Sequence, residues 1–190
     1  MKRLYKIISL CSLVFSLTTS VFAMGPVAIV KDVKGKVFMS LEGKVKTLKE
    51  GDHIYNFSNV MTSLGAQVSF SDYHDHKYHL AGSGQIHFTG NSLDLKKGYL
   101  WIKSFQSSAK DFFVETANAQ VKYERGESII SFDSFTGKTQ ILNVSGKAQV
   151  ANLHEKYRYV ELGSGQFSFV DLEYNGGAPR TPTSIGFGSF

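Results

Sequence analysis

The segment FFVETANAQVKYERGESIISFDSFTGKTQILNVSGKAQV, residues 112–150, alternates apolar and polar side chains with a period of two. Because successive side chains of a strand point to opposite faces of a sheet, this pattern indicates antiparallel strands with one buried face. Polar and glycine-containing breaks at 124–126, 133–137 and 145–147 predict turns. The segment therefore predicts four strands. The side chains expected on the apolar, core-facing side of these strands are Ala119, Val121, Tyr123, Leu142, Val144, Ala148 and Val150.

The chain outside this segment repeats the alternation in shorter pieces separated by glycines and polar residues. Abundant Val, Ile, Phe and Tyr with closely spaced turns are typical of an all-β protein. We expect an antiparallel two-sheet sandwich or a β-roll of short strands, with no substantial helix in the mature chain. The further predicted strands are 27–33, 36–40, 44–48, 59–62, 67–71, 77–80, 85–89, 98–105, 156–162 and 166–172.

Residues 1–23 have the pattern of a cleaved secretory signal peptide. A basic start is followed by an apolar run over 7–17 and by Val21-Phe22-Ala23 before the cleavage position. The apolar run is too short for a membrane-spanning helix. Cys11 does not follow a small residue, which disfavours a lipid anchor at this cysteine. We therefore expect a periplasmic or secreted protein that is not integral to the membrane.

Removing 23 of the 190 residues leaves 167, which fits one domain. Three of the 21 basic residues leave with the signal peptide, so 18 basic residues remain against 16 acidic ones, a net charge of +2. This balance, with no basic run, argues against nucleic acid as a partner. We expect the β domain over 24–172 and a flexible tail over 173–190, where Asn, Gly, Pro, Ser and Thr prevail.

The sequence Gly82-Ser83-Gly84-Gln85-Ile86-His87-Phe88 returns 81 residues later in similar form, as Gly163-Ser164-Gly165-Gln166-Phe167-Ser168-Phe169. An internal duplication and the same turn chemistry before two strands are both open as explanations. We favour the second because only seven residues match. Neither copy is a phosphate-binding loop, since a strand and not a helix is expected to follow.

Short motifs, most of them glycine-containing, follow one another along most of the chain from about 27 to 172. They are Val33-Lys34-Gly35-Lys36-Val37, Leu48-Lys49-Glu50-Gly51-Asp52-His53-Ile54, Val60-Met61-Thr62-Ser63-Leu64-Gly65-Ala66-Gln67-Val68-Ser69-Phe70, Leu95-Lys96-Lys97-Gly98-Tyr99-Leu100-Trp101-Ile102, Phe113-Val114-Glu115-Thr116, Gly126-Glu127-Ser128-Ile129, Asn143-Val144-Ser145-Gly146-Lys147-Ala148-Gln149-Val150 and Leu162-Gly163-Ser164-Gly165-Gln166. In their order and spacing these motifs resemble the FecR-like domain, the periplasmic module of bacterial sigma-regulator systems.

This resemblance implies a non-enzymatic signalling domain and no catalytic residues. The family's sigma regulators are similar to a chain with a cytoplasmic helical domain and one membrane span before the periplasmic domain, and the signal peptide is expected to replace both here. Asp72-Tyr73-His74-Asp75-His76 stands where the family has a tight Asp-Gly-Ser-like turn. A stand-alone periplasmic relative that binds another envelope component is therefore the expected form.

Histidines and carboxylates gather between residues 72 and 79, and His74, Asp75, His76 and His79 form a candidate metal site. Imidazole and carboxylate are ordinary ligands of zinc and copper. On a strand, His79 would face away from His74 and His76, so the three converge only if the backbone turns. A solvated hairpin tip is the competing interpretation, in which the protein needs no cofactor. The same histidines would give a contact surface that responds to mild acidification.

Tyr99 and Trp101 form the candidate partner-binding pair. Leu100 and Ile102 have the parity expected of core residues, which leaves the two aromatic side chains on the opposite face. Exposed aromatic residues are frequent at binding surfaces, and an indole can also stack on a carbohydrate. No serine has the strand–turn–helix context of a catalytic nucleophile, and no carboxylate pair suggests acid–base catalysis.

The sequence therefore favours a non-enzymatic binding or envelope-signalling module. Its expected partner is an envelope or outer-membrane protein, with a glycan as a further possibility. Two alternatives remain open. One is a periplasmic metal-binding protein that uses the histidine-rich hairpin, and the other is a small outer-membrane β-barrel, although most predicted strands are shorter than the 9–11 residues that span a membrane.

Overall fold

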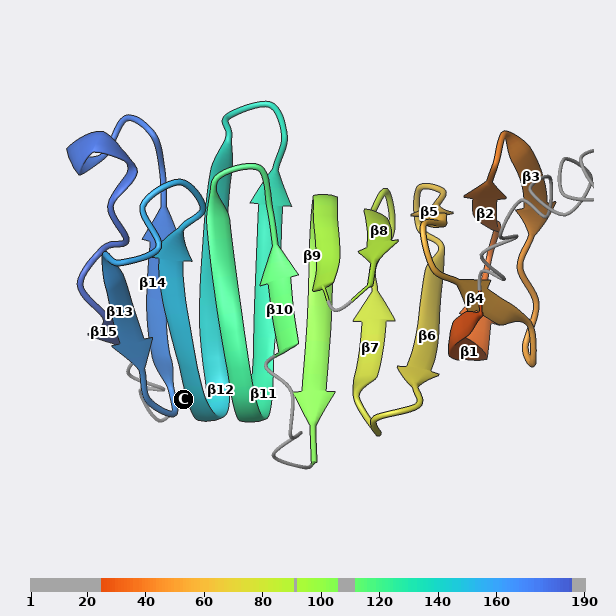
Figure 1. Ribbon diagram of the computed structural model, residues 1–190, viewed down its shortest axis with the longest axis horizontal. Helices are drawn as coiled ribbons and strands as arrows, with labels where there is room; N and C mark the ends of the chain where they lie inside the picture. Colours follow the sequence, from red (N-terminus) through yellow and green to blue (C-terminus); the bar gives the residue numbers. More distant parts are fainter. Residues whose placement is uncertain (1–24, 91, 106–111, 186–190) are drawn as a thin grey trace, which may run out of the picture.

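The computed structural model describes residues 25–90, 92–105 and 112–185, which form an all-β domain (Figure 1). The all-β prediction is therefore confirmed, while the predicted signal peptide lies outside the described residues. A short 3-10 turn, η1 (Asn175–Gly177), is the one helical element of the described ranges. The strands are β1 (Pro26–Lys34), β2 (Val37–Leu41), β3 (Lys44–Thr47), β4 (His53–Tyr55), β5 (Asn59–Thr62), β6 (Gln67–Asp72), β7 (Lys77–Leu80), β8 (Gln85–Thr89), β9 (Ser92–Ser104), β10 (Phe112–Glu115), β11 (Ala119–Asp133), β12 (Lys138–Asn152), β13 (Tyr159–Leu162), β14 (Gln166–Val170) and β15 (Thr183–Ser184).

The strands form two hydrogen-bonded layers that share the three long strands β9, β11 and β12. Layer A has the order β4-β1-β6-β7-β9-β11-β12-β14-β15. Layer B has the order β3-β2-β5-β8-β9-β10-β11-β12-β13, in which only β9 and β10 run parallel. Along the long axis of Figure 1, the chain proceeds from β3 and β4 at one end to β13 and β15 at the other.

The hydrophobic core lies between the two layers. Alternate side chains of each strand point into it, as the period-two pattern requires. Burial of apolar surface, at about 25 cal/mol per Å², is the main stabilising contribution in such a core. Representative core residues with at most 2% exposure are Phe70, Tyr78, Ile102 and Ile130 from layer A and Val60, Ile86, Val121 and Val150 from layer B.

Strands β11 and β12 pass from one layer to the other at a shared corner. Gly126 pairs with Gly146 there, and both have positive φ angles of 137° and 79°. A Cβ atom at Gly146 would lie 2.0 Å from the Arg125 carbonyl oxygen, so only glycine allows the two backbones to approach this closely. Hydrogen bonding continues through the corner, and the segment 112–150 therefore contains three strands and not the four predicted from its turns.

The corner also changes which parity faces the core. Leu142 and Val144 lie on the outer surface, with Val144 40% exposed, whereas Ile141 and Asn143 are buried. The sequence prediction for Leu142 and Val144 is thus wrong, because register shifts at the corner insert one extra residue. Each long strand shows the same interval of five residues between successive inward side chains across its corner, namely Leu95 to Leu100, Tyr123 to Ser128 and Asn143 to Ala148.

Glycines mark the corners at both ends of the sandwich. Gly98 at the β9 corner pairs with Phe132, whereas Gly126 pairs with Ser104 at the opposite end of the same strands. The two Gly-Ser-Gly sequences connect β7 to β8 and β13 to β14, which are also passages between the layers. Their shared role as layer-crossing turns agrees with the preferred explanation of repeated turn chemistry.

The described part of the predicted flexible tail, residues 173–185, packs on the domain. The short strand β15 pairs with β14, and the Ile185 amide donates to the Gly165 carbonyl at 2.9 Å. The buried amide of Asn152 donates to the Gly177 carbonyl at 2.8 Å. The flexible tail stays a prediction, and in its described part backbone pairing joins the chain to the domain although the composition has few apolar residues.

Candidate functional site

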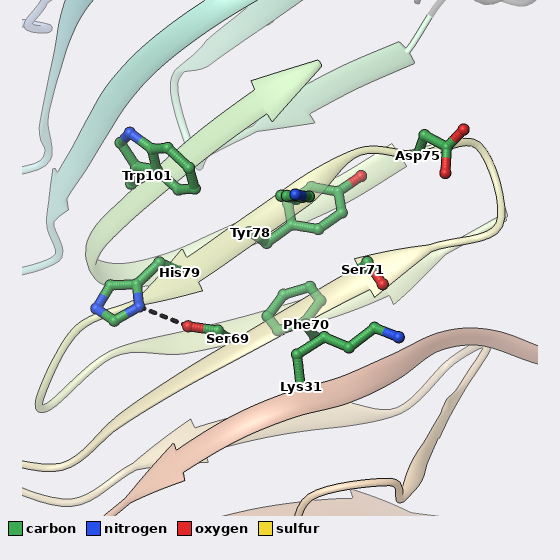
Figure 2. A pocket seen from close by; sticks show the side chains of 9 residues that line it. Lys31, Ser69, Phe70, Ser71, Asp75, Tyr78, His79 and Trp101 are labelled. Carbon is green, nitrogen blue, oxygen red and sulfur yellow. Dashed lines mark hydrogen bonds between the residues drawn. The ribbon is translucent and has the colours of Figure 1, made fainter. Parts of the chain in front are cut away.

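A groove of about 720 Å³ crosses the outer face of layer A over β1, β6, β7 and β9 (Figure 2). It contains residues from both sets predicted from the sequence, since Trp101, His79 and Asp75 all line it. Its volume falls in the range of small-ligand sites. The full lining is Lys31, Ser69, Phe70, Ser71, Asp75, Lys77, Tyr78, His79 and Trp101.

One row of side chains runs across the groove in register. Ser69 pairs with His79 between β6 and β7, and His79 pairs with Trp101 between β7 and β9. Side chains opposite one another on adjacent strands are close neighbours, which places the three groups side by side. The Ser69 hydroxyl and the His79 Nδ1 atom are 2.9 Å apart, and this hydrogen bond fixes the imidazole (Figure 2).

The Trp101 indole is held in place by an acidic partner on β11. Its Nε1–H donates to the Glu127 carboxylate at 2.8 Å, and Lys103 contacts the same carboxylate at 3.2 Å. These two contacts hold the pKa of the Glu127 carboxyl below its usual range. The indole is therefore positioned before any ligand arrives, which lowers the entropic cost of using it as a contact surface.

Two lysines line the groove, Lys31 from β1 and Lys77 from β7. Lys31 and Lys77 are exposed, and the Lys77 ammonium lies 5.0 Å from the centroid of the Phe105 ring. Lys103 approaches the same ring at 5.4 Å. Asp75, at the tip of the β6–β7 hairpin, contributes a carboxylate to the lining. The groove thus combines an aromatic side chain, hydroxyls, an imidazole and both signs of charge.

The four residues predicted as metal ligands do not converge. His76 is 3% exposed and points inward, where its ring centroid lies 4.8 Å from that of Phe112. His79 points to the outer face, and His74 and Asp75 are exposed on the hairpin loop. Asp75 has a φ of 62°, so the backbone does turn, but the turn leaves His76 and His79 on opposite faces. The described residues contain no group of three or more potential ligands.

His76 belongs instead to a buried hydrogen-bonded cluster centred on Asp72. The Asp72 carboxylate lies 2.6 Å from the His76 Nδ1 atom and accepts from the Tyr78 hydroxyl at 2.8 Å. Burial opposes ionisation of Asp72, yet the His76 and Tyr78 hydrogen bonds outweigh it and keep its pKa below the usual range. Burial and the Asp72 charge raise the pKa of Tyr78. This arrangement closes the hairpin and is structural.

The aromatic pair lies on the outer face, as the sequence predicts. Tyr99 is 59% exposed and Trp101 is partly exposed, whereas Leu100 and Ile102, which alternate with them, are fully buried. The row that contains Trp101 continues across layer A through apolar residues that are paired in register. We call this row the apolar strip, and its members are Trp101, Ile129, Leu142 and Phe167.

Several groove residues carried no signal in the sequence. Ser69 and Lys31 occupy ordinary outward positions of predicted strands, and only the pairing of β6 with β1 and β7 brings them beside His79. Strand alternation could have placed them on the outer face, but not next to the aromatic pair. The strip was also missed, because Leu142 was expected to face the core.

No family model matches the chain, and no curated protein matches it. Two crystal structures of a protein described as a putative anti-sigma factor from Parabacteroides distasonis do match, each with a TM-score of 0.55. This chain shares their fold. The sequence identities are 15% and 14%, and each match covers 66% of this chain and 59% of the other. The chain therefore spans less than two thirds of those proteins, and at this identity the likeness concerns the fold alone.

The geometry of the groove suits binding more than chemistry. Two of its side chains are fixed by hydrogen bonds, His79 by Ser69 and Trp101 by Glu127 of the neighbouring strand β11. No helix among the described residues is long and apolar enough to cross a membrane. The site is a preformed, partly aromatic surface with titratable groups at its rim.

Proposed function

We propose that this protein is a non-enzymatic binding module of the bacterial envelope that acts in signalling, and that it contacts an envelope or outer-membrane protein through the apolar strip. The observation that carries the proposal is the strip itself. Four apolar side chains lie in one cross-strand row on the outside of layer A, where a strand normally presents polar residues to water. Tyr99 extends it on the side of β9.

The shared fold with the Parabacteroides protein supports a signalling role. It agrees with the FecR-like resemblance of the sequence, which we propose as the family of this domain. A periplasmic or secreted location follows from the pattern of residues 1–23 and belongs to the same proposal. We infer no catalytic role. Ser69 and His79 form a hydroxyl–imidazole pair in the groove, but among the described residues no third group is hydrogen-bonded to His79 to orient its ring, as an activated nucleophile requires.

Strip variants test the proposal in cells that produce the tagged full chain. Ile129→Glu combined with Phe167→Glu places two charges in the strip, and desolvating them would oppose partner binding. We expect the partner that is crosslinked to the wild-type chain to be lost, with the variant present at normal level. Val45→Glu on β3, at a side chain that is 65% exposed, is the matched control and should retain the partner. Equal recovery by all three chains would contradict the proposal.

A further inference from the structure

The geometry points to a separate ligand for the groove beside the strip, namely an acidic saccharide whose sugar ring carries a carboxylate. This inference goes beyond the protein contact proposed above, and it concerns the groove residues Lys31, Ser69, Ser71, Lys77, His79 and Trp101. Trp101 belongs to both surfaces, but Ile129, Leu142 and Phe167 do not line the groove, and Lys31 and Lys77 do not belong to the strip. Variants at these positions therefore test the two proposals separately.

Trp101 supplies the aromatic platform. The apolar face of a pyranose ring packs against an aromatic side chain, and a rigid platform loses little conformational entropy on binding. The hydrogen bond from the indole Nε1–H to Glu127 restrains the ring before binding. Because Glu127 takes up the one polar group of the indole, what Trp101 offers a ligand is its hydrocarbon surface.

Sugar hydroxyls find hydrogen-bonding partners in the same register row. His79 uses its Nδ1 atom to bond Ser69, which leaves Nε2 as the ring nitrogen available to a ligand. Ser71 lies two residues along β6 from Ser69 and therefore points to the same face. Hydroxyls and an imidazole can donate and accept, which suits the mixed donor and acceptor character of a sugar.

Lysines favour an acidic sugar over a neutral one. Lys31 and Lys77 line the groove together with the single carboxylate of Asp75, which gives a lining charge of +1 when His79 is neutral. A carboxylate on the sugar would add an attractive interaction with these exposed ammonium groups. Interactions of this kind are screened by salt, so binding should weaken as ionic strength rises.

An acidic peptide is the competing ligand, and the sheet argues against it. The groove lies over strands whose two edges are both paired, because β6 bonds β1 and β7 while β7 bonds β6 and β9. A peptide strand therefore cannot add to the sheet here, and its amides and carbonyls would find only side-chain partners. A saccharide has no such backbone to satisfy.

Fluorescence of the full chain tests the inference directly, because Trp101 is the sole tryptophan of the sequence. Tetragalacturonate is the probe, with maltotetraose as the neutral saccharide and a tetraglutamate peptide as the acidic control. We expect a saturable change in Trp101 emission with tetragalacturonate and at least tenfold weaker binding of both comparison ligands. The affinity for tetragalacturonate should fall with added sodium chloride.

Charge-removing variants locate the binding. Lys31→Gln with Lys77→Gln should weaken tetragalacturonate binding at least tenfold and reduce its salt dependence. Lys44→Gln, on the exposed edge strand β3, is the matched control and should bind as the wild type. Four results would each overturn the inference. They are comparable binding of maltotetraose, preferred binding of the peptide, an unchanged affinity of the double variant for tetragalacturonate, and the lack of any saturable response. A strip variant distant from Trp101, Phe167→Glu on β14, leaves the groove lining unchanged and should retain tetragalacturonate binding.

Discussion

At the scale of single residues, two acidic side chains position residues at the groove through hydrogen bonds. Asp72 binds His76 and Tyr78 on the core side of the β6–β7 hairpin, and Glu127 on β11 binds the indole of Trp101. Both carboxyls have a lowered pKa because hydrogen-bond donors surround the ionised form. Replacing Asp72 should therefore lower the stability of the domain, and replacing Glu127 should increase the motion of the Trp101 indole.

Asp72→Asn should lower the free energy of unfolding by about 1–3 kcal/mol, because the buried His76 and Tyr78 lose a charged acceptor. The folded-state pKa of Asp72 is depressed, so its stabilising contribution is present above the unfolded pKa of about 3.9 and is lost as pH falls through the folded value. Urea unfolding between pH 7 and pH 2 measures both effects.

The acid-side loss of stability should be smaller in Asp72→Asn than in the wild type. Asp94→Asn, which alters an exposed pair with Lys96, is the surface control and should change little. An identical pH profile for Asp72→Asn and the wild type would show that this carboxylate does not contribute as described.

Glu127→Ala should release the indole of Trp101 without unfolding the domain. The expected result is lower fluorescence anisotropy of the single tryptophan and a red shift of its emission, because the ring gains motion and contact with water. Glu161→Ala, on β13 of layer B, is the control and should leave the spectrum unchanged. Unchanged anisotropy in Glu127→Ala would mean that packing alone fixes the ring.

At the scale of elements, the corners of β9, β11 and β12 determine which side chains reach each surface. Strand alternation alone predicted the exposure of Tyr99 and Trp101, because both lie beyond the Gly98 corner in one uninterrupted run. It failed for Leu142 and Val144, where the corner at Gly146 intervenes between them and Ala148. Beyond a bulge, inward and outward positions of the strand exchange, so an alternation that is continued through the bulge assigns the wrong face. In the sequence, the only sign of such a bulge is a glycine.

Gly146→Ala should be more destabilising than Gly43→Ala. Both glycines have positive φ, 79° and 76°, so both substitutions bear a similar backbone strain. Only at Gly146 would the new Cβ also collide with a backbone carbonyl, whereas nothing lies within 4 Å at Gly43. We expect the free energy of unfolding of Gly146→Ala to be lower than that of Gly43→Ala by about 1–3 kcal/mol, the range typical of overpacking. Thermal or urea unfolding measures this difference. Equal losses would contradict the close packing of the β11–β12 corner.

At the scale of the whole molecule, the groove and the strip share the outer face of layer A. The all-β class and most strand positions follow from period-two patterning and glycine spacing, which are local properties of the sequence. The groove and the strip depend on which strands pair, as when Trp101, Ile129 and Leu142 align across β9, β11 and β12. Such pairings join residues distant in sequence, so the sequence gives no local signal of them.

The outer face of layer A is the binding surface that we propose for this protein. Site-specific photo-crosslinking in intact cells tests it most directly, with a crosslinking residue at Tyr99, Ile129 or Leu142 on layer A and at Met61 or Gln149 on the outer face of layer B. We expect one repeated envelope protein to be captured from the layer A positions and not from those of layer B. Capture from layer B, or no repeated partner from any of the five positions, would contradict it.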